Sequence, residues 1–267
     1  MKTKFSIDLN RAGNLLVSAG VLFLAVSLFS SRSRANTTET ELTSDANGTS
    51  SITGTTNWSP ATTVAPTNVL ATTYDYVTAT TLRTPANQNS YTVYANSLSI
   101  NSGGSMGFKG SNVLTIPNLI LNGGKIANSA TSGNPDMARL AGTINLTGNS
   151  TLSPNGAGTF INMLAVITNG GSSTYTLTLN TAGTVILAAQ NTFTGNITVN
   201  NVAGSAILQL GANNAVPATA IITLNGGANA APIFDLHGFS TAIAGLNPTS
   251  ERSLAMRRTA LYPPPAR

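Results

Sequence analysis

The chain of 267 residues has no cysteine, a single histidine and few charges, since only 8% of its residues are Asp, Glu, Lys or Arg. The absence of cysteine excludes disulfide bonds and thiolate metal sites. A zinc site takes three or four ligands of the His, Cys or carboxylate type, and His237 is the only histidine that could contribute. We therefore assign no metal ligand and no cofactor.

The charges that are present gather at the two ends of the sequence. Residues 1–35 carry a net charge of +4 and residues 251–267 carry +3, whereas the body between them, residues 36–250, carries −2. The sequence pI of about 9.8 therefore reflects the ends and not the body. Binding to a phosphate backbone requires a basic surface, so we expect no nucleic-acid partner.

A short strand pattern recurs along the body: a branched apolar residue, any residue, a second branched apolar residue and then Asn. Its copies begin at intervals of 21, 25, 33, 20 and 25 residues, and we expect the interval of 33 to hold one longer loop. A period of this size predicts a stack of units and not one closed domain. The copies are Leu98–Asn101, Leu119–Asn122, Ile144–Thr147 (with Thr for Asn), Leu177–Asn180, Ile197–Asn200 and Ile222–Asn225.

This pattern predicts an all-β fold, a parallel β-helix (solenoid) with an irregular N-terminal cap. A unit of about 20–25 residues with two or three short strands is typical of one coil of such a fold, in which inward Leu, Ile and Val side chains stack between coils. The Asn residues at the corners would lie in line and could form hydrogen-bonded ladders. An antiparallel β-sandwich is the alternative, although its strands should recur at a spacing of about 8–12 residues without a longer period.

The clearest repeats lie between residues 183 and 246. They comprise Gly183–Leu187, Asn191–Val199, Ile207–Ala212, Asn214–Pro217 and Phe234–Phe239. Together these segments resemble the autotransporter-associated β-strand repeat, with Phe193 where that family usually has Tyr and His237 where Asn is common. The resemblance implies a right-handed β-helix of the passenger type in a bacterial exported or cell-surface protein. It implies no catalytic residue.

Residues 1–35 are typical of a secretory signal peptide. A positively charged start precedes the apolar run Leu15–Phe29, and Ser33 and Ala35 place small residues at positions −3 and −1 of a cleavage site. The run is too short for a comfortable membrane span, although an uncleaved anchor is the alternative. We expect the mature chain to be secreted or held at a bacterial cell surface, without an integral membrane span.

The segments that flank the repeats differ from them in composition. We predict a flexible Thr/Ser/Asn-rich leader at residues 36–56, and a cap or first strands at residues 57–97, ahead of β-helix repeats at residues 98–249. Trp58 either plugs the open end of the apolar core or stacks on a ligand as an exposed ring, and we favour the plug.

The basic tail, residues 250–267, breaks the Asn/Gly/Thr pattern, and its three consecutive prolines cannot form a coil. We interpret this tail as a non-native terminus, for example a frameshift. The alternative is a basic extension that binds a partner.

No catalytic set emerges from the sequence, so we assign no catalytic residue. Asp235 and His237 lie two apart but lack a nucleophile that can be placed beside them. A polysaccharide lyase would need several acids on one face beside Lys109, Lys125 or Arg139, and the acids of the body are scattered.

These observations favour an exported, non-enzymatic β-helix protein, a structural or adhesive passenger-like segment at the cell surface. Its expected partners are cell-surface or matrix glycans or other surface proteins. A carbohydrate-binding or polysaccharide-degrading β-helix protein is the alternative, and a cleft with three or more acids on one face would favour it.

Overall fold

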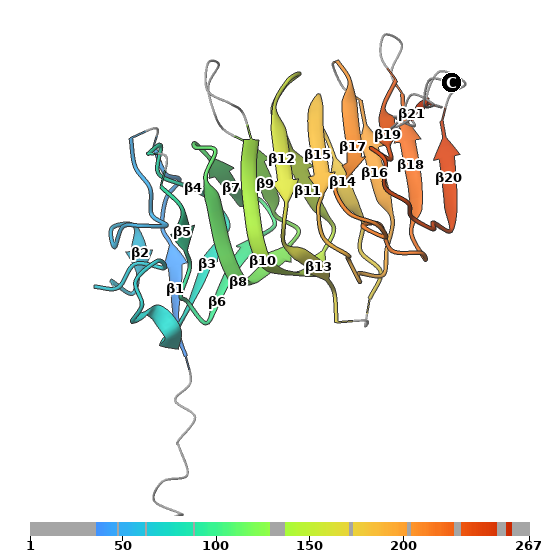
Figure 1. Cartoon of the computed structure of the whole chain (residues 1–267). Helices are drawn as coiled ribbons and strands as arrows, with labels where there is room; N and C mark the ends of the chain where they lie inside the picture. The colour runs from blue at the N-terminus through green and yellow to red at the C-terminus, as the bar shows by residue number, and fades with distance from the viewer. Residues whose placement is uncertain are drawn as a thin grey trace, which may run out of the picture. The chain divides into compact units, whose positions relative to one another are not determined.

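The strands of this protein stack side by side along one direction, as the computed structural model shows in Figure 1. The predicted signal peptide, residues 1–35, lies outside the residues that the structure describes. The structure describes residues 36–46, 48–61, 63–87, 89–128, 137–170, 173–201, 204–226, 231–249 and 255–257.

Thirteen strands form the larger sheet, called sheet A, and in the described chain all of its ladders are parallel except the one between β1 and β2. β5 (Tyr91–Thr92) and β13 (Val166–Thr168) pair at its side with β8 and β10. In order, its main path consists of β2 (Trp58–Ser59), β1 (Thr37–Glu41), β3 (Tyr74–Thr78), β6 (Ser97–Asn101), β8 (Val113–Asn122), β10 (Met137–Gly148), β12 (Phe160–Met163), β15 (Gly183–Leu187), β17 (Ala206–Leu210), β19 (Ile233–Asp235) and β21 (Ala255–Arg257).

Eight parallel strands form sheet B, and the chain alternates between the two sheets as it advances. The result is a β-solenoid of about seven turns, so the predicted parallel β-helix is confirmed and the antiparallel sandwich is wrong. One short 3-10 helix, η1 (Ala71–Thr73), precedes β3. In order, sheet B consists of β20 (Gly245–Pro248), β18 (Ile221–Asn225), β16 (Ile197–Asn200), β14 (Leu177–Leu179), β11 (Ser150–Ser153), β9 (Lys125–Asn128), β7 (Ser105–Phe108) and β4 (Thr81–Arg83).

The register of sheet B corrects one expectation about the repeats. The first three copies of the strand pattern lie in sheet A, on β6, β8 and β10, whereas the last three lie in sheet B, on β14, β16 and β18. Leu177 therefore pairs with Ser150 and not with Ile144. The long interval between the third and fourth copies is a change of face and not an enlarged coil, since the coil that ends at Leu177 begins at Ser150.

The long strands β8 and β10 bend, so sheet A covers two faces of the coils around them. The first half of β8 pairs with β5 and its second half with β6, with Pro117 between them. In β10 the bend is at Gly142, whose φ is +106°, and a Cβ there would lie 1.9 Å from the carbonyl oxygen of Ile116. Only glycine fits this position. The coils of β8 and β10 therefore have three strand-bearing sides, two from sheet A and one from sheet B, whereas from β15 onward each coil has one strand in each sheet.

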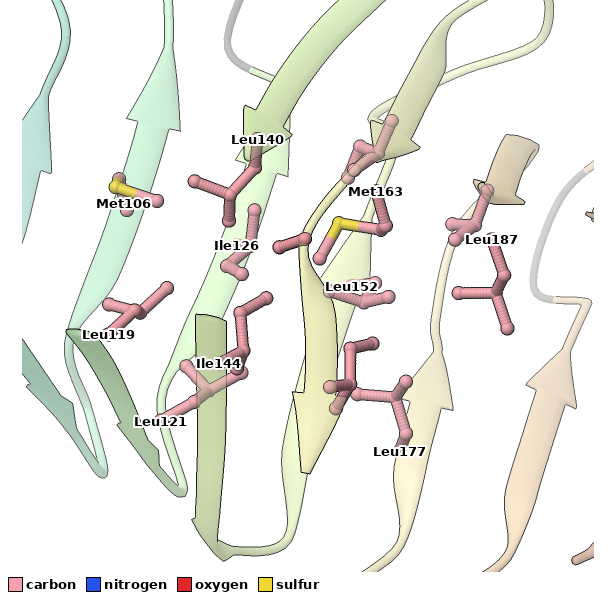
Figure 2. Close-up of a cluster of buried hydrophobic side chains, with 14 of the residues drawn as sticks. Met106, Leu119, Leu121, Ile126, Leu140, Ile144, Leu152, Met163, Leu177 and Leu187 are labelled. Carbon is pink, nitrogen blue, oxygen red and sulfur yellow. The ribbon is translucent and has the colours of Figure 1, made fainter. Parts of the chain in front are cut away.

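The core is a set of apolar columns that run through the coils (Figure 2). Leu140, Met163 and Leu187 are register neighbours on β10, β12 and β15, and each is at most 1% exposed. Opposite them, Ile126 pairs with Leu152 on sheet B. Burying one such side chain completely contributes about 1.5–3 kcal/mol. The alternation of the strands thus places one continuous core inside the stack.

The corner asparagines form the predicted ladders. Asn122 donates to Asn101 with an N–O distance of 3.2 Å. On sheet B, Asn225 donates to Asn200 over 2.7 Å, and Asn200 donates to Asn180 over 3.5 Å. These amides link neighbouring coils at the end of a strand, where the backbone ladder stops.

Two segments outside the predicted repeats also join the stack. β3 and β4 pair in parallel with β6 and β7, so the stack includes residues from Tyr74 onward in the segment that we assigned to a cap or first strands. At the other end, β21 pairs in parallel with β19, although it lies in the segment that we interpreted as a non-native tail. The rest of that tail, residues 250–254 and 258–267, lies outside the described residues.

Candidate functional site

Buried polar groups are concentrated at the N-terminal end of the solenoid. Residues 36–56, which we predicted to be a flexible leader, instead contain β1, which pairs in parallel with β3. The side chains of Glu39 and Glu41 alternate along β1 and point inward, so these residues are only 2% and 3% exposed. Asp45, which follows β1, is 5% exposed. The leader is ordered because β1 covers the edge of β3, which would otherwise be open.

Glu41 has two hydroxyl partners on the next coil. Its Oε2 accepts hydrogen bonds from Thr78 Oγ1 at 2.5 Å and from Thr80 Oγ1 at 3.1 Å. Glu41 Oε1 and Glu39 Oε2 are buried and have no hydrogen-bond partner within the described chain. Burial raises the pKa of both carboxyls. For Glu41 the hydrogen bonds from Thr78 and Thr80 oppose this rise, and the negative charge of Asp45 adds to it.

Asp45 joins its loop to the next coil. Its Oδ2 accepts from the backbone N–H groups of Ser51, at 2.9 Å, and Arg83, at 2.8 Å, and its Oδ1 accepts from Ser51 Oγ at 2.6 Å. In return, Arg83 Nε donates to the backbone carbonyl of Asp45 at 3.2 Å. A carboxylate that is bonded in this way, with three of its about four lone-pair sites occupied, fixes the loop to β4.

A hollow of about 300 Å³ lies beside this loop. Six of its eight lining residues are Ser, Thr or Asn, and Asp45 is the one acidic residue among them. Across it, Thr43 Oγ1 donates to Asn57 Oδ1 at 2.6 Å. The lining residues are Thr43, Ser44, Asp45, Ala46, Thr49, Ser51, Thr56 and Asn57.

Trp58 closes the N-terminal end of the core, as the plug interpretation predicts. It is 2% exposed and meets Tyr76 edge to face, with 4.8 Å between the ring centroids. Its Nε1 donates to the carbonyl of Ser51 at 3.0 Å. The alternative, an exposed ring that stacks on a ligand, is wrong. We call β1, β2 and the described residues that connect them (42–46 and 48–57) the N-terminal cap.

Asp235 and His237 lie together at a turn near the other end. Asp235 Oδ2 accepts from Gln209 Nε2 on β17 at 2.9 Å, and Asp235 Oδ1 accepts from the backbone N–H of His237 at 2.9 Å. The imidazole Nδ1 is 3.9 Å from Asp235 Oδ2, and the ring is 56% exposed. His237 has a φ of +45°. These contacts are those of a corner residue in a turn.

The cations that a lyase could use lie on different parts of the solenoid. Lys109 Nζ donates to the carbonyl of Thr49 at 2.9 Å, and burial together with the charge of Arg83 lowers its pKa. Lys125 is exposed on sheet B, and Arg139 Nε contacts Met137 Sδ on β10 at 3.3 Å. Throughout the residues that the structure describes, no three or more His, Asp or Glu side chains gather as a metal site would require.

Comparison with protein families, curated proteins and solved structures finds no match to this chain. Among the described residues, no helix combines the length and apolar character that crossing a membrane takes. The buried acids of the cap were not predicted, because their segment is rich in Thr and Ser and resembles a flexible segment in composition. The alternation of Thr and Glu in Thr37–Glu41 has the period of a strand and could have identified β1, but it carries no signal that the glutamates face inward.

Proposed function

We propose that this chain is an exported, non-enzymatic β-solenoid that serves as a structural or adhesive segment at a bacterial cell surface. One observation carries the proposal: three carboxylates that could do chemistry are used to join neighbouring coils. Asp45 bonds to β4, Asp75 accepts from Asn96 and Ser97 on the following coil, and Asp235 accepts from Gln209. Carboxylates committed to structure in this way are typical of a scaffold.

The outer surface of sheet B supports an adhesive role. Thr151, Thr178, Thr198 and Thr223 are register neighbours on four successive strands, and each is partly exposed. Parallel strands lie about 4.8 Å apart, so the hydroxyls repeat at this spacing along the stack. A neutral repeating surface suits many weak contacts with an uncharged glycan or a surface protein, and repeated contacts add through avidity.

Export rests on the sequence features of residues 1–35 and on the resemblance of residues 183–246 to passenger repeats. The test is the location of the protein. We expect protease added to intact cells to remove the chain and a gene deletion to lower attachment to a matrix. A chain that is protected from protease until the cells are lysed would overturn the proposal.

A carbohydrate-binding role is the second candidate. The aligned threonines of sheet B (Thr151, Thr178, Thr198 and Thr223) favour it. The triple variant Thr178→Val, Thr198→Val and Thr223→Val removes three hydroxyls with little change in shape. We expect it to lose most of the binding to an insoluble neutral polysaccharide, while Thr115→Val, a partly exposed position on β8, binds as the wild type does. Equal binding by both variants would reject this surface. Release of reducing ends from the polysaccharide would instead indicate an enzyme.

A further inference from the structure

We propose that the N-terminal cap is a pH-dependent closure of the solenoid, held most firmly in mild acid and opening as the pH rises toward neutral and alkaline values. This inference does not rest on the proposed function, because it concerns the side chains of one edge strand. Three observations carry it: the place of β1 in the stack, the partners of its carboxyls, and the position of Trp58.

The carboxyls of β1 head two inward columns that are apolar in the following coils, except for the buried Thr78 directly behind Glu41. Glu39 pairs with Tyr76, which pairs with Leu98 and then, through β8, with Leu119. Because the strand alternates, Glu41 heads the neighbouring inward column, which continues through Thr78, Ile100 and Leu121. β1 thus extends the core with two ionisable groups, and those groups are as deeply buried as the apolar residues behind them.

Ionisation of these carboxyls is unfavourable in the closed cap. A buried carboxylate needs hydrogen bonds or a counter-charge, yet Glu39 Oε2 and Glu41 Oε1 have no partner in the described structure. When protonated, each group is neutral, and the desolvation penalty of the charge disappears. The closed cap therefore favours the protonated form, whereas an open cap, with its carboxyls in water, does not.

The charged groups around the cap do not relieve this penalty. β2 carries no titratable side chain, and on β3 the carboxylate of Asp75 is bonded to Asn96 and Ser97. Asp45 adds negative charge near Glu41. The guanidinium of Arg83 and the ammonium of Lys109 bond to the carbonyls of Asp45 and Thr49. The described chain contains no ion pair between a cation and either glutamate.

The sign of the pH effect follows from proton linkage. The closed cap raises the pKa of both glutamates above their ordinary value of about 4.5, so it binds more protons than the open cap does. The contribution of these two carboxyls to the stability of the cap is then greatest below pH 4.5 and falls as the pH rises through the raised pKa values. The ratio of open to closed cap grows by up to about tenfold per pH unit for each carboxyl that titrates.

Opening of the cap has a defined structural consequence. β1 would leave the edge of β3, and Trp58 would leave Tyr76, so the end of the core and a row of backbone hydrogen-bonding groups would meet solvent. Such an edge can pair with another extended strand. The device therefore controls access to the N-terminal edge of sheet A.

Trp58 is the only tryptophan of the chain, so its fluorescence reports the cap alone. We would measure acrylamide quenching of the full chain, together with amide hydrogen exchange of β1 and β17, between pH 4.5 and 8. We expect the protection factors of β1, corrected for intrinsic exchange, to fall with pH while those of β17 stay constant, and quenching to rise. Constant protection of β1 over this range would overturn the proposal.

Matched variants test whether the two glutamate carboxyls, and not other titratable groups, cause the pH dependence of the cap. The double variant Glu39→Gln and Glu41→Gln keeps the shape and removes both charges, so we expect the protection of β1 to become independent of pH. Asp235→Asn, at the distant turn, should retain the wild-type profile. If the double variant lowers overall stability, the single variants provide the same test, each with a shallower slope. A double variant that keeps the wild-type slope would contradict the assignment to these two residues.

Discussion

On β14, β16 and β18 of sheet B, the inward positions are filled by Leu, Ile and Val, whereas at the N-terminal end the inward positions of β1, in sheet A, are filled by Glu39 and Glu41. The interior coils have a neighbour on both sides and are held by apolar columns, corner amides and buried amide bridges such as that of Asn191. The edge coil has one neighbour, and its exposed backbone is covered by an antiparallel strand, a tryptophan and bonded hydroxyls. An interior coil is therefore covered by its two neighbours, whereas the end of the solenoid needs additional contacts that cover its open edge.

The largest effect should come from the middle of the stack. Leu152 is completely buried between Ile126 and Leu179. We expect Leu152→Ala to lower the free energy of unfolding by about 2–5 kcal/mol, because it removes methyl groups and leaves a cavity. Urea denaturation followed by circular dichroism measures this loss. The adjacent outward variant Thr151→Ala is the control and should change stability by less than about 0.5 kcal/mol.

The second largest loss of stability should come from removing a buried side-chain amide. Asn191 is 6% exposed; its Oδ1 accepts from the N–H of Ile167 at 2.7 Å, and its Nδ2 donates to the carbonyl of Ala215 at 2.6 Å. Asn191→Ala leaves both backbone groups unpaired, so we expect a loss of about 1–3 kcal/mol in the same urea titration. A change close to zero would mean that backbone hydrogen bonds can replace this bridge between three coils.

The third effect comes from placing an apolar side chain at an inward position of β1. It tests whether this position favours an apolar residue, as the inward positions of the middle coils do. We expect Glu39→Leu to stabilise β1 by about 1 kcal/mol at pH 8, because an unpaired buried carboxylate is replaced by an apolar side chain. At pH 4, where the glutamate is protonated, the gain should be smaller. Hydrogen exchange of β1 at both pH values provides the measurement. A variant that is less stable than the wild type at pH 8 would show that the carboxylate supports the cap.

The smallest effect should come from the corner ladders. Asn200 lies between Asn180 and Asn225 and is partly exposed. We expect Asn200→Ala to cost about 0.5–1.5 kcal/mol, since water can replace part of what is lost. Thermal unfolding of this variant beside Asn101→Ala, from the other ladder, would reveal whether the longer ladder contributes more.

The coils could be predicted from the sequence because, in a repeating fold, the same strand pattern recurs at a regular spacing along the chain. Leu177–Asn180, Ile197–Asn200 and Ile222–Asn225 are successive strands of sheet B, as their spacing indicates. The face on which each copy lies was not predictable, because a copy on sheet A and a copy on sheet B have the same alternation. The interval from Ile144 to Leu177 was misinterpreted for this reason.

The order of the cap could not be predicted from composition. Thr, Ser and Asn are common both in flexible segments and in strands whose side chains bond to neighbours. Asp45 and Thr78 bond to partners that lie far away in the sequence, Arg83 and Glu41 respectively. Such partners become visible only once the coils are stacked. The burial of Trp58 could be predicted, because a single large aromatic residue at the start of a solenoid can be buried against the open end of the apolar core.

The hydrogen bonds between coils run along the axis of the stack, and this has a mechanical consequence. A force applied along the axis would act parallel to the hydrogen bonds between two neighbouring coils. These bonds would then break one after another, so the coils would detach one at a time and not all together. In sheet B, one coil separates register partners such as Leu177 and Ile197, or Ser150 and Leu177. Each released coil, of about 20–27 residues, would therefore add about 70–95 Å of slack. Under tension, the stack would therefore lengthen in steps, one coil at a time.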